Sequence, residues 1–215
     1  MLLSEPQRAL ISTIEATHTK IKESEIELET KAQYPEIGSD AAAKKWKQVT
    51  LDTSKQNVGS QIAAMNAATA QVVTLTLAQD EVDHHAVGAA ITTIGSNLPE
   101  MTREVKKIIA FTDDQNMGDK LLDATRHLCK AFSDLLRAAE PESKEPKQSL
   151  LNAASRVGDA STQVLATIGE DTAENKELQD LLMSLAKAVA NTTAALVLKA
   201  KNIASTCDDQ QTQNR

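Results

Sequence analysis

The sequence predicts an all-α protein: an antiparallel amphipathic five-helix bundle, followed by an additional long helix from an incomplete second bundle. Three observations lead to this prediction. Aromatic residues make up only 2% of the 215 residues, and there are 7 glycines and 5 prolines, whereas strand-rich folds need aromatic and β-branched runs with frequent turns. Apolar residues recur at helical spacing along nearly the whole chain. Proline, glycine and short polar segments interrupt that pattern at only a few places.

Capping and breaking residues delimit the helical segments. The expected bounds are about residues 4–34, 40–75, 83–109, 119–140, 146–169 and 173–205. Ser4 and Gln7 have the spacing of a capping box at the start of the first segment, and Pro35 follows its end. The second segment is expected to include Trp46 and Val49 among its apolar positions.

The third, fourth and fifth segments are delimited mainly by proline and glycine. Pro99 lies inside the third, where we expect a kink but no chain reversal, because the apolar pattern keeps its phase. The fourth is expected to begin near Asp119 and to stop before Pro141, since the residue ahead of a proline disfavours helical geometry. Pro146 suits the first turn of the fifth segment, and Gly169 ends it.

Short connections between these segments favour antiparallel neighbours. Residues 1–170 are therefore predicted to form a five-helix bundle, and residues 171–215 to supply the first helix of the next bundle plus a frayed tail. The sixth segment carries too many apolar residues to be left in water, which is why we assign it to a second bundle. The sequence leaves open whether that helix packs on the first bundle, exchanges with a neighbouring molecule or stays separate.

Charge and cysteine content exclude several classes of partner. The 23 Lys and Arg residues are outnumbered by 30 Asp and Glu, a formal net charge of −7, and no dense basic face for nucleic acid is present. The same charge argues against a polybasic membrane patch, and no weakly charged stretch is long enough to span a bilayer. We expect no nucleic-acid partner and no direct membrane insertion. Two distant cysteines without a signal-peptide pattern predict a reduced, intracellular compartment.

No arrangement of residues predicts catalysis, a metal or a cofactor. Neither common glycine-rich phosphate loop is present. His84 and His85 are adjacent, so on a helix they point about 100° apart and are poorly placed to share a metal. His127 and Cys129 face different sides of a helix, which disfavours a histidine-activated thiolate. We therefore expect that the chain is not an enzyme and needs no cofactor.

The fourth segment carries a continuous apolar face. Its apolar and small residues follow one another at steps of three and one, the spacing of one side of a helix. We name them the 121–139 stripe: Leu121, Ala124, Thr125, Leu128, Cys129, Phe132, Leu135, Leu136 and Ala139. The charged residues Asp123, Arg126 and Lys130 avoid this stripe. On pattern alone, any core helix of a bundle has this appearance.

The 121–139 stripe resembles the vinculin-binding helix motif of talin rods, a leucine–alanine–alanine–valine series at the same steps. Four further phrases are similar to the start of a talin rod: residues 86–98, 138–141, 150–154 and 194–200. The similarity covers essentially residues 4–205, and it implies the first five-helix rod bundle plus the opening helix of the next. The stripe departs from the motif at Thr125, Cys129 and Phe132, where alanine, alanine and valine are preferred.

A possible second vinculin-binding helix lies in the sixth segment. The same steps recur in what we name the 182–200 stripe: Leu182, Leu185, Ala186, Val189, Ala190, Thr193, Leu196, Val197 and Ala200. Leu185 and Thr193 depart from the motif, so this match is weaker. The fifth segment matches more loosely still, with Ser161 and Ile168 out of pattern, and we interpret it as core only.

The resemblance implies a cytoskeletal adaptor that senses force. It implies a cytoplasmic protein of the cytoskeleton at cell–matrix adhesions, on the inner face of the plasma membrane. The vinculin head domain would bind the two stripes, and integrin and actin would bind other parts of a full-length protein. The stripes would be cryptic, buried in the bundle core until force or bundle opening exposes them. Two alternatives stay open: an exchangeable lipid-binding bundle, disfavoured by scarce aromatics and negative charge, and a passive scaffold bundle.

Overall fold

A computed structural model of the chain describes residues 3–30, 34, 38–77, 81–141, 147–169, 180–181, 183–185 and 187. These residues contain five long helices and no strand, so the predicted all-α class is confirmed. The helices are α1 (Glu5–Glu29), α2 (Ala41–Leu77), α3 (His84–Phe111), α4 (Gln115–Ala138) and α5 (Lys147–Ile168). No helix in this part of the chain is both long and apolar enough to cross a membrane.

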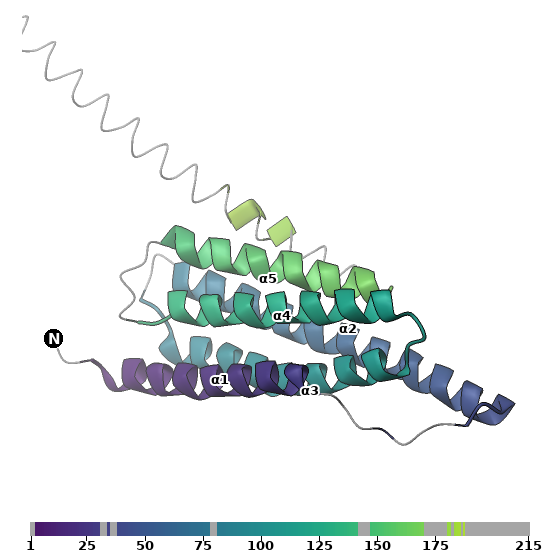
Figure 1. Ribbon diagram of the computed structural model, residues 1–215. Helices are drawn as coiled ribbons and strands as arrows, with labels where there is room; N and C mark the ends of the chain where they lie inside the picture. The colour runs from purple at the N-terminus through teal and green to yellow at the C-terminus, as the bar shows by residue number, and fades with distance from the viewer. Residues whose placement is uncertain are drawn as a thin grey trace, which may run out of the picture.

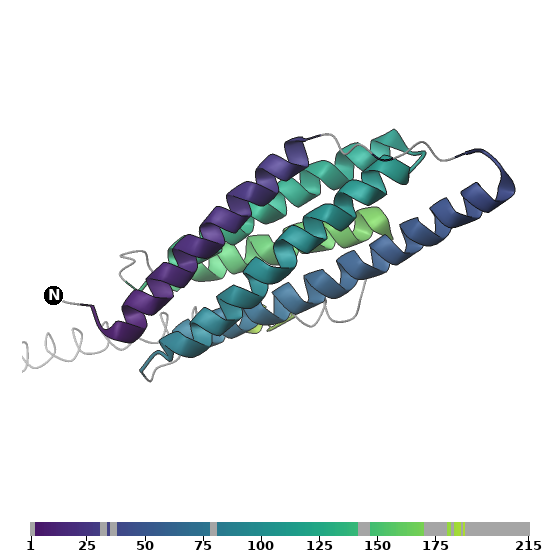
Figure 2. The same ribbon diagram turned by 90° about the horizontal axis from the view of Figure 1, so that it is seen from below.

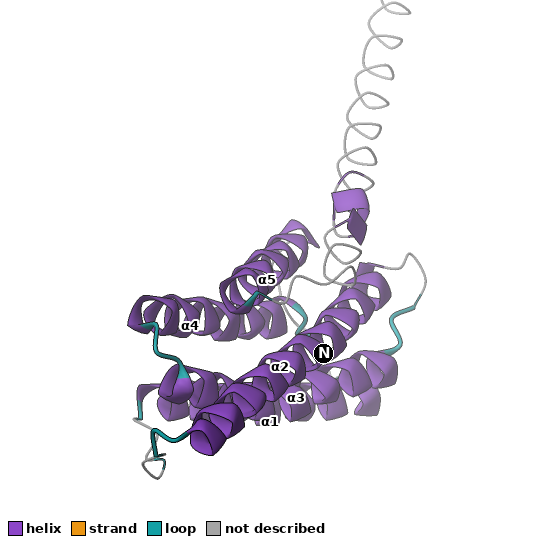
Figure 3. Cartoon of the chain, turned by 90° about the vertical axis from the view of Figure 1, so that its right-hand side faces the viewer, coloured by secondary structure: helices purple, strands orange, loops and turns teal. Residues whose placement is uncertain are grey.

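The helices alternate in direction and pack as an elongated bundle (Figures 1 and 2). α3 contacts α1, α2 and α4, and α4 contacts α1, α3 and α5. α2 and α5 also contact each other. The five helices therefore form a closed ring in the order α1, α3, α2, α5, α4, with α3 and α4 touching across its middle. Seen from one end, α4 lies beside α5 and α1 lies beside α3 (Figure 3).

Local signals set the ends of three helices as the sequence predicts. At α1, the Ser4 hydroxyl accepts a hydrogen bond from the Gln7 N–H, and the Gln7 side chain accepts one from the Ser4 N–H at 2.9 Å. α3 continues through Pro99 as one helix, so the chain does not reverse there. α4 ends before Pro141. Gly169, which follows α5, has a φ of +79° that residues with a Cβ rarely adopt.

The start of α4 differs from the prediction. The helix begins at Gln115 and not near Asp119. Asp114 is its N-cap, and the Asp114 carboxylate accepts a hydrogen bond from the Met117 N–H at 3.1 Å. The cap outweighs the low helix propensity of Gly118, which had suggested a loop over this stretch.

The first turns of α2 also differ from the prediction. Trp46 and Val49 are 54% and 55% exposed, so they do not belong to the buried face that the periodicity suggested. The reason is geometric: α2 extends past the ends of the other helices (Figures 1 and 2), and its buried residues begin only at Ser54. The Trp46 ring instead meets Phe111 edge-on at 5.8 Å, and Tyr34 lies 5.1 Å from Phe111 on centroid distances.

The core is aliphatic, but it contains a buried threonine on each of four helices. Thr17, Thr69, Thr102 and Thr125 are all at most 3% exposed. Each hydroxyl donates to the carbonyl four residues earlier on its own helix, at 2.7 to 2.9 Å. These hydroxyls are therefore satisfied without bonding to another helix, and they bury less apolar surface than an aliphatic side chain would.

The predicted sixth helix, residues 173–205, lies largely outside the described residues. Of those that are described, Leu181 and Met183 are exposed, whereas Leu185 is partly buried against the core. The division of the chain into residues 1–170 and 171–215 stays a prediction.

Candidate functional site: the buried face of α4

α4 is a strongly amphipathic helix with a cap at each end. Asp114 caps its first turn, and the Ala139 N–H donates to the Leu135 carbonyl at its last turn. Arg137 lies in that last turn, where its positive charge is favourable beside the free carbonyls of the helix end. The helix is thus defined locally, and one face of it is left to pack.

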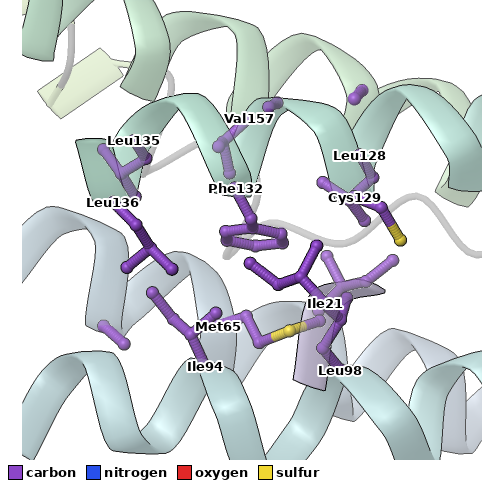
Figure 4. Close-up of a cluster of buried hydrophobic side chains, with 14 of the residues drawn as sticks. Ile21, Met65, Ile94, Leu98, Leu128, Cys129, Phe132, Leu135, Leu136 and Val157 are labelled. Carbon is purple, nitrogen blue, oxygen red and sulfur yellow. The ribbon is translucent and has the colours of Figure 1, made fainter. Parts of the chain in front are cut away.

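Every residue of the 121–139 stripe is buried, with an exposed fraction of at most 5%. Leu128, Cys129, Phe132, Leu135 and Leu136 point into the bundle interior (Figure 4). Two further small residues of α4, Gly118 and Ala131, are buried although they lie outside the predicted stripe. Ala131 follows Leu128 at a helical step of three, a spacing that could have included it.

Phe132 occupies the centre of the packed face. Its ring is fully buried and points toward Ile21 of α1, Met65 of α2, and Ile94 and Leu98 of α3 (Figure 4). Side chains from three other helices therefore surround the largest residue of the stripe. α5 covers the other side of α4, with Val157 near Phe132 (Figure 4).

Cys129 is a free, fully buried thiol. Burial, with a smaller contribution from the charge of Glu25, raises the pKa of this thiol to about 12. A protonated thiol is a poor nucleophile, so Cys129 is chemically inert while the bundle is closed. His127 is exposed and therefore faces away from Cys129, as the sequence spacing indicated.

The outward face of α4 makes ion pairs at the surface. Arg126 pairs with Glu29 of α1 at 2.7 Å and with Asp123 at 3.5 Å. Asp134 pairs with Arg156 of α5 at 3.1 Å. Exposed pairs of this kind contribute about 0–1 kcal/mol each. The stability of α4 in the bundle therefore comes mainly from the 121–139 stripe.

The 182–200 stripe is almost entirely outside the described residues. Among its members only Leu185 is described, and it is partly buried against the core. Whether these residues form one helical face stays a prediction.

Comparisons with known proteins give one consistent result. A family model for the talin middle domain matches residues 6–165. Human talin-2 is 45% identical over 215 residues, which are 99% of this chain and 8% of talin-2. Chicken talin-1 is 43% identical over 99% of this chain, which corresponds to 8% of the length of talin-1. The talin of Oscarella pearsei is 48% identical over 87% of this chain, which corresponds to 7% of the length of that talin. The chain thus spans less than a tenth of the curated relatives that it matches.

Proposed function

The chain belongs to the talin family, and from that premise we propose that it is a rod segment of a cytoskeletal adaptor in which α4 is a cryptic binding helix for the vinculin head domain. The adaptor would act at the cytoplasmic side of cell–matrix adhesions. Integrin and actin would bind through parts of the full-length protein that lie outside these residues.

The observation that carries this proposal is the burial of the helical face that resembles a vinculin-binding motif. The 121–139 stripe resembles a vinculin-binding motif, and each of its residues is buried inside the bundle. An amphipathic helix binds an apolar groove with the same residues that would otherwise form its core face. The stripe is therefore available either to the bundle or to a partner, but not to both.

The energy of that burial sets the mechanism. Leu121, Leu128, Phe132, Leu135 and Leu136 are fully buried. At about 1.5–3 kcal/mol each, they contribute about 8–15 kcal/mol of gross burial. The net stability of a whole domain is also about 5–15 kcal/mol. α4 therefore cannot leave while the rest stays folded, and its exposure requires the bundle to open.

Because only open molecules can bind, the apparent affinity of the partner is its affinity for the exposed helix multiplied by the fraction of molecules that are open. Tension would raise that fraction. α1 begins and α5 ends at opposite ends of the elongated bundle (Figure 1), so a force between these ends acts along the long axis. The buried threonines bury less apolar surface than aliphatic residues would, which lowers the free energy that opening requires.

A comparison of the intact chain with isolated helices tests the proposal. A peptide of residues 115–141 should bind the vinculin head domain much more tightly than the intact chain does, because the peptide has no bundle to open. A peptide of residues 147–169, which contains the apolar face of α5, is the matched control and should bind weakly. Equal affinities for the intact chain and the 115–141 peptide would contradict a cryptic site. No binding by that peptide would favour the passive scaffold.

A further inference from the structure

α1 is the helix that separates the 121–139 stripe from solvent on one side of the bundle. It contacts only α3 and α4 among the described helices. Its buried apolar side chains are Leu10, Ile14, Ile21 and Leu28. Ile21 lies beside the ring of Phe132 of α4 (Figure 4). Loss of α1 from α4 would therefore uncover part of the stripe.

His18 lies on α1 where this helix meets α4. Its Nδ1 atom is 3.5 Å from the Ser133 hydroxyl oxygen, and the imidazole is partly buried. Positive charges stand on both helices, with Arg137 on α4 and Lys22 one turn further along α1. Glu140, after the end of α4, is the negative group that acts on the same ring.

The other neighbour of α1 presents a glycine to this stretch. Gly95 of α3 lies so close to Thr17 that an added Cβ would be 3.2 Å from the Thr17 methyl carbon. Such tight packing leaves little room for the helix to shift on α3. His18 follows Thr17 in the chain, and its ring meets α4 at Ser133, so a charge on His18 acts at the junction with α4.

The surroundings of His18 favour its neutral form. Burial lowers the pKa of His18 below its ordinary value of 6.5, Arg137 and Lys22 lower it further, and Glu140 opposes them. The unfolded chain therefore binds the proton more readily than the folded chain does. The stability that the neutral ring provides is present above pH 6.5 and is lost as the pH falls through the lowered pKa.

We propose that His18 is a proton-sensitive contact between α1 and α4, and that its protonation weakens the docking of α1 and raises the exposure of the 121–139 stripe. The effect on the bundle depends only on the residues of this chain. The consequence that mild acid favours binding of the vinculin head domain rests, in addition, on the proposed function.

The first test is the pH dependence of unfolding in urea. The chain and its His18→Gln variant are compared at pH 7.5 and pH 5.5, because glutamine keeps a hydrogen-bonding side chain but does not titrate. When the pH falls from 7.5 to 5.5, the equilibrium constant for unfolding should rise in both proteins. We expect this rise to be at least about twofold larger in the chain than in the His18→Gln variant. His127→Gln is the matched control: His127 is exposed on the outward side of α4, and its variant should keep the full acid response. Parallel responses of the chain and His18→Gln would overturn the proposal.

The second test reads opening at the stripe itself. The second cysteine, Cys207, is first replaced by serine so that Cys129 is the one thiol that can react. The alkylation rate of buried Cys129 is then measured at each pH in this protein and in the same protein with His18→Gln. At each pH, the rate in the protein with His18 is divided by the rate in the His18→Gln variant, which cancels the intrinsic pH dependence of the thiol. This ratio should rise as the pH falls from 7.5 to 5.5. A constant ratio would contradict the proposal even if the variant were less stable. Neither test includes vinculin, so failure of the contact is distinguishable from failure of the proposed function.

Discussion

Thr125 places a hydroxyl in the middle of the 121–139 stripe, at a position with no exposed surface. The hydroxyl donates to the Leu121 carbonyl at 2.7 Å. In an α-helix that carbonyl is also the acceptor for the Thr125 backbone N–H, so it does not depend on the side chain. At the scale of single residues, the stripe thus combines large aliphatic groups with a polar group that limits how much apolar surface is buried.

Thr125→Val should stabilise the closed bundle by about 0.5–1.5 kcal/mol, because a methyl group replaces a desolvated hydroxyl of similar shape. Urea unfolding measures the gain, and binding of the vinculin head domain to the intact chain should weaken. Thr93→Val is the matched control, since Thr93 makes the same kind of bond to Ala89 on an exposed face. Tighter binding by Thr125→Val would contradict the account.

Leu128→Ala should weaken the bundle by about 2–5 kcal/mol, because the fully buried leucine leaves a cavity. The same change in the 115–141 peptide should weaken binding of the vinculin head domain, measured by calorimetry. Lys130→Ala, on the exposed side of α4, should change both quantities little. If stability fell while peptide binding stayed the same, one face could not serve both purposes.

At the scale of the elements, α4 depends on an N-cap, Asp114, that the local sequence does not distinguish from its neighbour. Asp114 follows Asp113 in a polar stretch, and only the fold shows which of the two carboxylates reaches a free N–H. The Asp114 carboxylate accepts from Met117, whereas Asp113 is 96% exposed in side-chain area and pairs with Lys47. The two neighbours therefore have different roles despite the same chemistry.

Asp114→Ala should destabilise the bundle by about 1 kcal/mol, because it leaves the first turn of α4 without its cap. Asp113→Ala, which removes only an exposed ion pair, should cost much less. Urea unfolding of the two variants side by side measures the difference. Equal losses would show that the cap does not set the start of α4.

Much of the helical layout could be predicted from local chemistry. The capping box of Ser4 and Gln7, the proline after α4 and the glycine after α5 act within a few residues, so the sequence reveals them directly. The exposure of Trp46 and Val49 could not be predicted, because it depends on where the neighbouring helices end. The 121–139 stripe was correctly expected to be buried, since helical periodicity is local, but the helices that cover it follow only from the tertiary fold.

At the scale of the whole molecule, the five helices form a ring in which α3 and α4 each have three neighbours. Because α4 contacts three other helices, it is released only when those neighbours separate from it. The stability of the whole bundle, including residues far from α4, should therefore control access to the 121–139 stripe. Binding of a partner to that stripe then reports the free energy of opening.

The most direct measurement of this claim is the affinity of the vinculin head domain for an intact Ile14→Ala variant. Ile14 is fully buried on α1 and lies outside the stripe, so the change should weaken the bundle by about 2–5 kcal/mol and leave the binding residues intact. Thr19→Ala, on the exposed side of α1, is the control.

We predict that the affinity of Ile14→Ala rises about tenfold for each 1.4 kcal/mol of stability lost, up to the affinity of the 115–141 peptide, while the control is unchanged. An affinity that stays constant although the bundle is measurably weaker would contradict the account, because the partner would then bind without opening the bundle.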